Sequence, residues 1–311
     1  MDTASLPIDT LPLLTQLLRQ SFGSQIEIEG WRIAKQHEDY FVLVVELRQP
    51  SSRIVVKLAG PRAPYACLFD RTATLHRLVA ARTAVPIPEI LAVDVSYNMW
   101  PWRYIIESFV PGETWMTVRQ RINPQELADS YSQIGAAVAE LHAIHFPQFG
   151  ELSKDGTTHN GTNKYLAALT TRMQQSIRSP RLVDLFLALL ETNTALFEGI
   201  YQASLCHEDL HGHNILFEQV DGRWRLAAIL DFDKAWAGHH EIDLARMELW
   251  SMAEEGFWAG YNARYDDSYE RRRPIYQLLW CLEYAVATPR HLADTQRLCK
   301  ELGLPLLQNF K

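Results

Sequence analysis

Cysteine is scarce in this 311-residue chain, and the cysteines present form no motif. Cys67, Cys206, Cys281 and Cys299 lie far apart, and no two of them have the C-x-x-C spacing of a zinc ribbon or a redox site. Such scattered cysteines also argue against a disulfide framework. We therefore expect a protein of the reducing cytoplasm.

Long apolar runs are missing as well. The segment MDTASLPIDTLPLLTQLLRQ has an acidic second residue and polar breaks between its apolar positions, which predicts an amphipathic helix, not a signal peptide or a membrane span. The formal net charge is −7, which argues against nucleic acid as a partner. With 47% hydrophobic and 22% charged residues, the composition is that of an ordinary globular protein that binds neither nucleic acid nor membrane.

Two carboxylates and an amide stand at informative positions in the segments CHEDLHGHNILF and ILDFDKAWAGHHEID. Asp209 precedes Asn214 by five residues, and Asp231 follows a short apolar run. Phosphoryl transfer needs one carboxylate to orient and deprotonate the attacking hydroxyl, and it needs an amide oxygen and a second carboxylate to hold Mg²⁺ against the phosphates. The three side chains occur in that order, which predicts a phosphoryl-transfer site.

A lone Asp–Asn pair is more typical of a turn, but here two apolar runs follow it. They are Ile215–Phe217 and 224–230, and a polar turn around Asp221 and Gly222 separates them, which predicts a β-hairpin. A hairpin brings its outer ends together, so Asn214 and Asp231 can share one cation. Oxygen ligands with few carboxylates suit Mg²⁺.

The alternating side chains of His207, Asp209, His211 and His213 also allow a zinc hydrolase, in which imidazoles bind a metal that activates water. Such a site needs no lysine far upstream. The chain has one, because Lys57 interrupts the apolar strand pattern RIVVKLAG, where a charge is expected to face solvent or a phosphate. Together with the downstream pattern, Lys57 favours phosphoryl transfer.

At this point the chain resembles the aminoglycoside phosphotransferase and choline kinase family, whose fold is similar to that of protein kinases. The matching segments are RIVVKLAG, AVPIPEILAVD, YIIESFVPGETW, IGAAVAELHAIH, LCHEDLHGHNILF and ILDFDKAWAGHHEIDLARM. The resemblance implies an α+β fold with a small antiparallel-sheet N-lobe and a larger, mainly helical C-lobe. We expect the nucleotide-binding lobe at residues 1–110 and the catalytic and acceptor-binding lobe at 111–311.

The resemblance also implies roles for single residues. Asp209 would be the catalytic base, Asn214 and Asp231 the metal ligands, and Lys57 the lysine that binds the nucleotide phosphates. Backbone groups of four consecutive residues would meet the adenine or guanine base: Glu107, Ser108, Phe109 and Val110.

Asp233, His207 and Asp70 are secondary candidates in this comparison, and Asp243 matches the family as a structural residue. His207 is expected to hold the catalytic loop by a hydrogen bond to backbone near Asp231. Asp243 is expected to cap a helix or to anchor the preceding loop. Asp233 either adds to the metal shell or ends the strand after Asp231.

Two features depart from the kinase pattern. The turn expected at residues 34–40 contains no glycine, and Glu38 and Asp39 would repel phosphates if they pointed inward. Kinases also pair the strand lysine with a glutamate on the next helix, but Thr72 occupies that position here. Asp70, about half a turn away, is the candidate replacement.

The sequence therefore predicts a Mg²⁺-dependent small-molecule kinase that transfers the γ-phosphoryl group of ATP or GTP to a hydroxyl of an aminoglycoside or a similar polar metabolite. The alternative is a catalytically weak or inactive nucleotide-binding regulator. A protein kinase is disfavoured, because no Ala-Pro-Glu anchor follows Asp231. Acidic and aromatic residues after Asp243 are candidates for binding a cationic acceptor: Glu248, Trp250, Glu254, Glu255, Trp258, Tyr261, Tyr265, Asp266, Asp267 and Tyr269.

Overall fold

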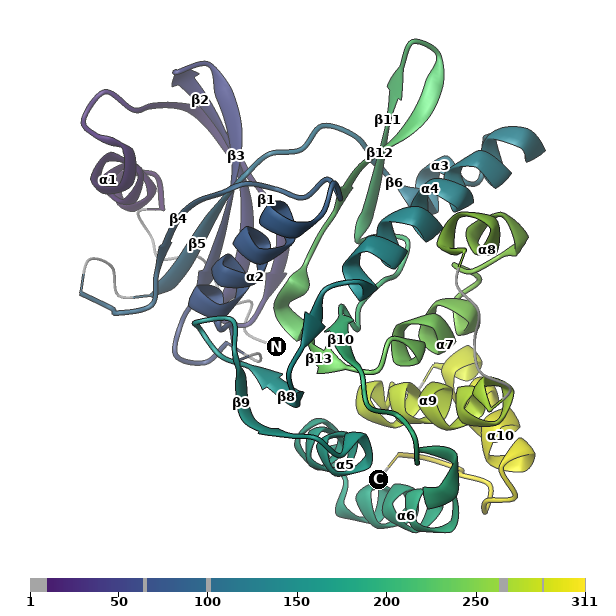
Figure 1. The fold of residues 1–311 in the computed structure, drawn as a ribbon. Coiled ribbons are helices and arrows are strands. Elements are labelled where there is room, and N and C mark those ends of the chain that lie inside the picture. Colours follow the sequence, from purple (N-terminus) through teal and green to yellow (C-terminus); the bar gives the residue numbers. More distant parts are fainter. Residues whose placement is uncertain (1–9, 64–65, 99–101, 263–267, 287, 311) are drawn as a thin grey trace.

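The computed structural model describes residues 10–63, 66–98, 102–262, 268–286 and 288–310. Figure 1 shows a sheet-rich lobe and a mainly helical lobe, with α2 between the N-terminal sheet and the strands β8 and β9. This arrangement confirms the predicted α+β, two-lobed class. The boundary between residues 110 and 111 stays a prediction.

The N-lobe is built on a five-stranded antiparallel sheet with strand order β1-β2-β3-β5-β4. Its elements are α1 (Thr10–Phe22), β1 (Glu27–His37), β2 (Tyr40–Gln49), β3 (Ser52–Ala59), α2 (Phe69–Arg82), β4 (Ile90–Asp94) and β5 (Arg103–Ser108). Apolar residues of α1 pack on one face of the sheet, and α2 covers the other. The predicted N-terminal amphipathic helix is α1, and residues 1–9 of that segment lie outside the described residues.

The C-lobe contains most of the helices and one large apolar core. Its helices are α3 (Trp115–Val118), α4 (Pro124–His142), α5 (Tyr165–Ser176), α6 (Pro180–Thr192), η1 (Thr194–Leu196), η2 (Phe232–Lys234), α7 (Glu241–Leu249), α8 (Glu255–Tyr261), α9 (Tyr269–Tyr284) and α10 (Pro289–Glu301). Its strands are β6 (Glu113–Thr114), β7 (His145–Phe146), β8 (Phe149–Leu152), β9 (Thr158–Thr162), β10 (Ala203–Cys206), β11 (Ile215–Val220), β12 (Arg223–Ile229) and β13 (Trp236–Gly238).

The predicted hairpin is present as β11 and β12, which pair in antiparallel register from Ile215 with Ile229 to Val220 with Arg223. The short strand β6 pairs with the other edge of β11. Gly112, just before β6, has a φ of +141°, and a Cβ there would lie 2.8 Å from the carbonyl oxygen of Phe217. The chain can therefore pass this close to the hairpin only with a glycine. Within the described ranges, no helix has the length and apolarity needed to cross a bilayer.

The turn between β1 and β2 is shorter than predicted. Strand β1 continues to His37 and β2 begins at Tyr40, so the turn contains only Glu38 and Asp39. Asp39 is buried, and its carboxylate accepts hydrogen bonds from Arg62 Nε at 2.9 Å and Arg62 Nη2 at 2.8 Å. Its charge is thus neutralised by an arginine, which removes most of the expected repulsion of phosphates.

Candidate active site

Asp209 lies in the loop between β10 and β11, and His207 holds that loop in place. The Nε2 atom of His207 donates to the carbonyl oxygen of Leu230 at 3.0 Å, and its Nδ1 atom accepts from the backbone N–H of Asp209 at 3.2 Å. These two bonds require the neutral imidazole with its proton on Nε2. The predicted hydrogen bond from His207 to backbone beside Asp231 is confirmed.

Asp243 anchors the same loop from helix α7. Its buried carboxylate accepts from the backbone N–H groups of His207 and Glu208, both at 2.7 Å, and lies 3.2 Å from His142 Nε2. No side chain caps α7, so of the two predicted roles the anchor is the one present. Burial alone would raise the pKa of Asp243, but the hydrogen bonds from His142 and the loop outweigh it and lower that pKa.

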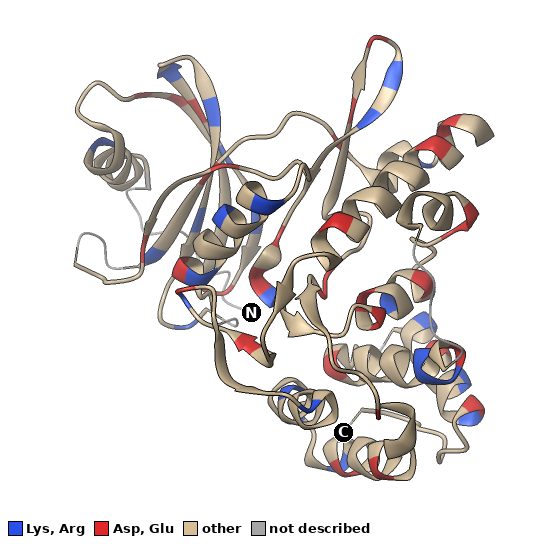
Figure 2. Cartoon of the chain, in the orientation of Figure 1, with Lys and Arg blue, Asp and Glu red and all other residues tan. Residues whose placement is uncertain are grey.

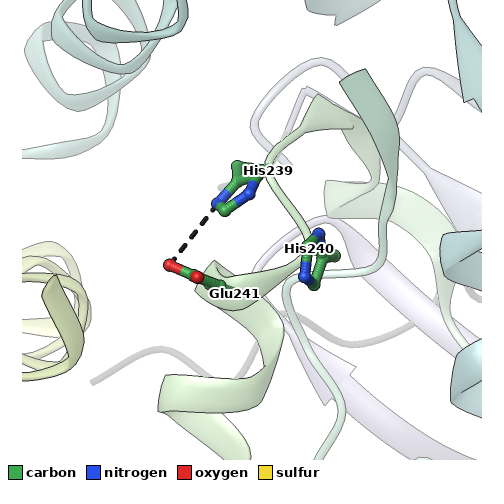
Figure 3. Close-up of side chains that lie close together, drawn as sticks. All are labelled: His239, His240 and Glu241. Carbon is green, nitrogen blue, oxygen red and sulfur yellow. Dashed lines mark ion pairs between the residues drawn. The ribbon is translucent and has the colours of Figure 1, made fainter. Parts of the chain in front are cut away.

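The zinc interpretation is wrong for the alternating histidines, because both ring nitrogens of His207 are already engaged. Among the described residues, the group of three His, Cys, Asp or Glu side chains close enough to share a metal is instead His239, His240 and Glu241 (Figure 3). Both carboxylate oxygens of Glu241 accept from Arg272 at 2.7 Å. That carboxylate is therefore committed to a buried ion pair with arginine.

Asn214 and Asp231 lie side by side, as the hairpin predicted. The backbone N–H of Leu230 donates to the carbonyl oxygen of Asn214 at 2.8 Å, which brings Asp231 next to the loop. The amide nitrogen of Asn214 donates to the backbone oxygen of Asp209 at 3.0 Å and to its Oδ2 at 3.3 Å. The amide oxygen is then the atom of Asn214 that can bind a cation.

Asp231 itself has the marks of a cation ligand. Its backbone is left-handed, with a φ of 70°, and its buried Oδ1 has no hydrogen-bond partner within the described part of the chain. A buried oxygen without a hydrogen bond is costly, and a bound cation would satisfy it. Together with Asn214, it forms an oxygen donor set that suits Mg²⁺.

Lys57 has a glutamate partner after all, but the partner comes from a strand. Lys57 Nζ lies 3.1 Å from Glu107 Oε1 and 3.8 Å from Asp231 Oδ1; the side chains of Lys57 and Glu107 are buried, and that of Asp231 is partly buried. Val55 is the register partner of Glu107, so the side chains of Lys57 and Glu107 emerge on the same face of neighbouring strands. Burial alone would lower the pKa of Lys57, but the two carboxylates raise it.

The expectation that the helix supplies this partner through Asp70 is wrong. Asp70 accepts from the backbone N–H of Arg71 at 2.9 Å, at the start of α2. Thr72, at the position of the usual glutamate, donates instead to Asp233 Oδ1 at 2.8 Å. The physical reason is that β5 lies beside β3, so Glu107 reaches Lys57 across one strand spacing.

Asp233 faces the same region as Asp231. Burial and the nearby Asp231 carboxylate raise the pKa of Asp233 to about 6. Burial alone would also raise the pKa of Asp231, but the positive charge of the neighbouring Lys57 outweighs burial and lowers that pKa. Two crowded carboxylates of this kind favour a divalent cation between them.

The segment predicted to meet the base is largely occupied by bonds within the N-lobe. The N–H of Ser108 donates to the carbonyl oxygen of Glu89 at 2.8 Å, and the N–H of Phe109 donates to that of Arg53 at 3.3 Å. The side chain of Glu107 forms an ion pair with Lys57. Val110 is then the backbone donor of this segment that remains for a base, and the contact of residues 107–110 with a nucleotide stays a prediction.

Two residues that contact Asp209 were not predicted from the sequence. The hydroxyl of Tyr284 donates to Asp209 Oδ1 at 3.0 Å, and Lys234 Nζ lies 3.8 Å from the same oxygen. Lys234 also donates to the Tyr284 hydroxyl. Lys234 could have been noticed because it stands three residues after Asp231, whereas Tyr284 is 75 residues from Asp209 and carries no local signal.

The proposed acceptor residues are only partly near the loop. Trp250 stacks on His211, two residues after Asp209. Trp258 and Tyr261 instead pack with Phe257 on α8, which lies against α4, so they belong to the lobe's packing. Tyr269 is buried, and its hydroxyl donates to Glu248. Glu254 and Glu255 are exposed at the start of α8. Tyr265, Asp266 and Asp267 lie outside the described residues.

A model of the phosphotransferase enzyme family matches residues 32–277, which include Lys57 and the whole loop and hairpin. The chain belongs to this family. No curated protein sequence matches it. Its fold is similar to that of a thermostable mutant of aminoglycoside phosphotransferase APH(4)-Ia in ternary complex with AMP-PNP and hygromycin B, with a TM-score of 0.64 and 14% identity over 93% of this chain and 96% of the other.

Two other solved structures have similar folds. One is the GDP and kanamycin complex of APH(2″)-IIIa, with a TM-score of 0.60 and 13% identity over 93% of this chain and 97% of that one. The other is a putative aminoglycoside phosphotransferase from Ralstonia eutropha, with a TM-score of 0.60 and 16% identity over 94% and 95%. The predicted family and kinase-like fold are confirmed, and the protein is a member of a phosphotransferase family.

Proposed function

We propose that the protein is a Mg²⁺-dependent kinase that transfers the γ-phosphoryl group of ATP or GTP to a hydroxyl of an aminoglycoside or a similar polar metabolite. The observation that carries this proposal is the convergence of Lys57, Asp209, Asn214 and Asp231 from three separate segments onto one region. The complexes of the similar folds with AMP-PNP or GDP support a nucleotide as donor.

Each residue has a defined task in this reaction. Asp209 accepts a hydrogen bond from the acceptor hydroxyl and takes its proton while the oxygen forms a bond to the γ-phosphorus. The bond from the γ-phosphorus to the β–γ bridging oxygen breaks, so the products are a phosphate monoester and a nucleoside diphosphate. Lys57, held by Glu107, neutralises phosphate charge. Mg²⁺, when held by Asn214 and Asp231 with Asp233 nearby, supplies further charge neutralisation of the phosphates.

The alternative, an inactive nucleotide-binding regulator, loses one of its two supports. It was motivated by a lysine without a glutamate partner, and Glu107 provides that partner at 3.1 Å. The glycine-free turn between β1 and β2 remains, but Asp39 in that turn is paired with Arg62. The geometry therefore favours an active enzyme.

Acceptor-stimulated release of ADP or GDP, measured in the presence of Mg²⁺, tests the proposal. A panel of aminoglycosides, choline, neutral sugars and homoserine would be scanned with ATP and with GTP. We expect at least one acceptor to stimulate release, and the stimulation to disappear when Mg²⁺ is chelated. Saturable nucleotide binding with no stimulation by any acceptor class would instead support the regulator.

We also expect the apparent affinity for Mg²⁺ to fall by up to about tenfold per pH unit below pH 6, where a proton competes for Asp233. The sign follows from the raised pKa: the carboxyl group is protonated below about 6 and ionised above it. Titration of Mg²⁺ against a fluorescent nucleotide at pH 5 to 8 measures this. The Asp233→Asn variant should bind Mg²⁺ more weakly and with a flatter pH profile; an unchanged profile would remove Asp233 from the metal shell.

A further inference from the structure

Six side chains of alternating charge form one connected row, which we call the charge ladder. Each side chain is at most 29% exposed, and the six come from both lobes. In Figure 2, basic positions lie on α2, α5 and α7, and an acidic one lies on β8. In order along the ladder, the residues are Arg71, Glu151, Arg172, Glu208, Arg246 and Glu283.

Arg172, on α5, binds both the Asp209 loop (residues 207–214) and the Asp231 segment (residues 231–234). Its Nε and Nη2 atoms donate to Glu208 Oε2 at 3.0 and 2.7 Å, one residue before Asp209. Its Nη2 atom also donates to the carbonyl oxygen of Lys234 at 2.7 Å, three residues after Asp231. One guanidinium group therefore connects the loop that carries the candidate base to the segment that carries the candidate metal ligand.

The other two arginines of the charge ladder bind backbone oxygens of the same loop and segment. Arg71, on α2 of the N-lobe, donates to the carbonyl oxygen of Asp233. Arg246, on α7, donates from Nη1 to the carbonyl oxygen of Glu208 at 3.0 Å and to its Oε2 at 3.1 Å. A shared glutamate, Glu151, joins Arg71 to the rest of the ladder. The ladder thus ties both lobes to the loop and the segment.

Glu208 adopts a backbone conformation that is unfavourable for a residue with a side chain. Its φ is +64°, in the left-handed region, and its side chain is buried. Within the described part of the chain, its Oε1 atom has no hydrogen bond. Buried ion pairs with an unsatisfied oxygen add little to stability. Strain that the surrounding structure enforces is typical of functional sites, and here it stands one residue before Asp209.

We propose that Arg172 is a positioning residue, which fixes the separation between Asp209 and Asp231. It acts through the Glu208 carboxylate on one side and through the Lys234 carbonyl oxygen on the other. This inference rests on the proposed function, in which the acceptor hydroxyl at Asp209 must meet a phosphoryl group held beside Asp231. A misplacement of about 1 Å can lower the rate of such a step by about 100-fold.

The variant Arg172→Lys tests this role, because it keeps the positive charge and removes the planar fork of donors. We expect it to lower kcat by about 10- to 100-fold, while KM for the nucleotide changes by less than about threefold. A merely structural arginine would not produce this split in a variant that folds. A kcat within about threefold of wild type would overturn the proposal.

Arg272→Lys is the matched control. Arg272 is also buried, donates to both carboxylate oxygens of Glu241 at 2.7 Å, and binds a backbone carbonyl oxygen, that of Leu196, at 2.8 Å. Urea denaturation should show a similar loss of stability for the two variants, but the control should keep kcat within about threefold of wild type. An equal loss of kcat in both variants would show that the effect is general destabilisation, and would contradict the proposal.

Hydrogen–deuterium exchange tests the connection without turnover. Peptides covering residues 207–214 and 231–236 should exchange at least about tenfold faster in Arg172→Lys than in wild type. Both peptides should keep wild-type exchange in Arg272→Lys. Because one guanidinium group binds both parts of the chain, faster exchange in only one of the two peptides, or in neither, would contradict the proposal.

Glu208→Gln serves as the second variant if Arg172→Lys does not fold. The amide keeps the shape of the side chain and removes the charge that Arg172 and Arg246 bind. We expect kcat to fall by at least about threefold, because the hydrogen bonds that hold the Asp209 loop lose their charge assistance. Wild-type kcat in Glu208→Gln would overturn the role of the ladder.

Transfer and exchange together distinguish this inference from the proposed function. Transfer by wild type with an unchanged kcat in Arg172→Lys would confirm the kinase and overturn the inference. No transfer by wild type to any acceptor, with both peptides exchanging faster in Arg172→Lys, would contradict the kinase and support the connection that Arg172 makes.

Discussion

Asp209→Asn is expected to lower kcat by about 10²- to 10⁴-fold while the affinity for Mg²⁺–nucleotide changes little. The amide keeps the shape of the side chain but cannot take the proton of the acceptor hydroxyl. Nucleotide affinity should be retained because Lys57, Glu107 and Asp231, which we propose to face the phosphates and the metal, do not depend on the charge of Asp209.

The measurements are steady-state transfer and the binding of a fluorescent nucleotide analogue. Asp221→Asn is the matched control, because Asp221 is exposed in the β11–β12 turn with a φ of 50°, which asparagine tolerates. The control should keep wild-type activity. Turnover of Asp209→Asn within a few-fold of wild type would refute the assignment of the base.

Asp243→Ala is expected to lower the free energy of unfolding by about 3–5 kcal/mol, the range found when one partner of a buried charged network is removed. The substitution leaves the N–H groups of His207 and Glu208 buried without an acceptor, and it removes the partner of His142. Because these N–H groups fix the loop that carries Asp209, any folded variant should also lose activity.

Urea denaturation measures the change, with Asp184→Ala on the exposed face of α6 as the control, for which we expect a change within about 0.5 kcal/mol. The pKa of Asp243 is lowered in the folded state, so its contribution is present above the unfolded pKa and is lost as the pH falls through the folded pKa. The wild type and Asp243→Ala should therefore converge in stability at acidic pH. A loss of less than about 1 kcal/mol at neutral pH would contradict the anchor role.

The catalytic loop and hairpin could be predicted from the sequence because their geometry is local. Asn214 and Asp231 flank one hairpin, so pairing of β11 with β12 brings them together without any long-range information. His207 and Asp243 were likewise placed correctly, since both act on this loop.

The partners supplied by distant segments could not be predicted. Glu107 was assigned to the base-binding segment, and only the adjacency of β3 and β5 shows that its side chain reaches Lys57. Tyr284 reaches Asp209 because α9 ends beside the catalytic loop, which no periodicity in the sequence indicates. In the β1–β2 turn, the charge of Asp39 suggested repulsion, but Arg62 from a later loop neutralises it.

The most direct test of the central claim is to follow the γ-phosphoryl group itself. Wild-type protein and Asp209→Asn would be incubated with Mg²⁺, γ-labelled ATP or GTP and the acceptor that best stimulates diphosphate release, and the products would be separated and identified by mass spectrometry. We predict a labelled phosphate monoester of the acceptor with wild type and almost none with the variant. Label found only in inorganic phosphate, or equal product from both proteins, would contradict the account.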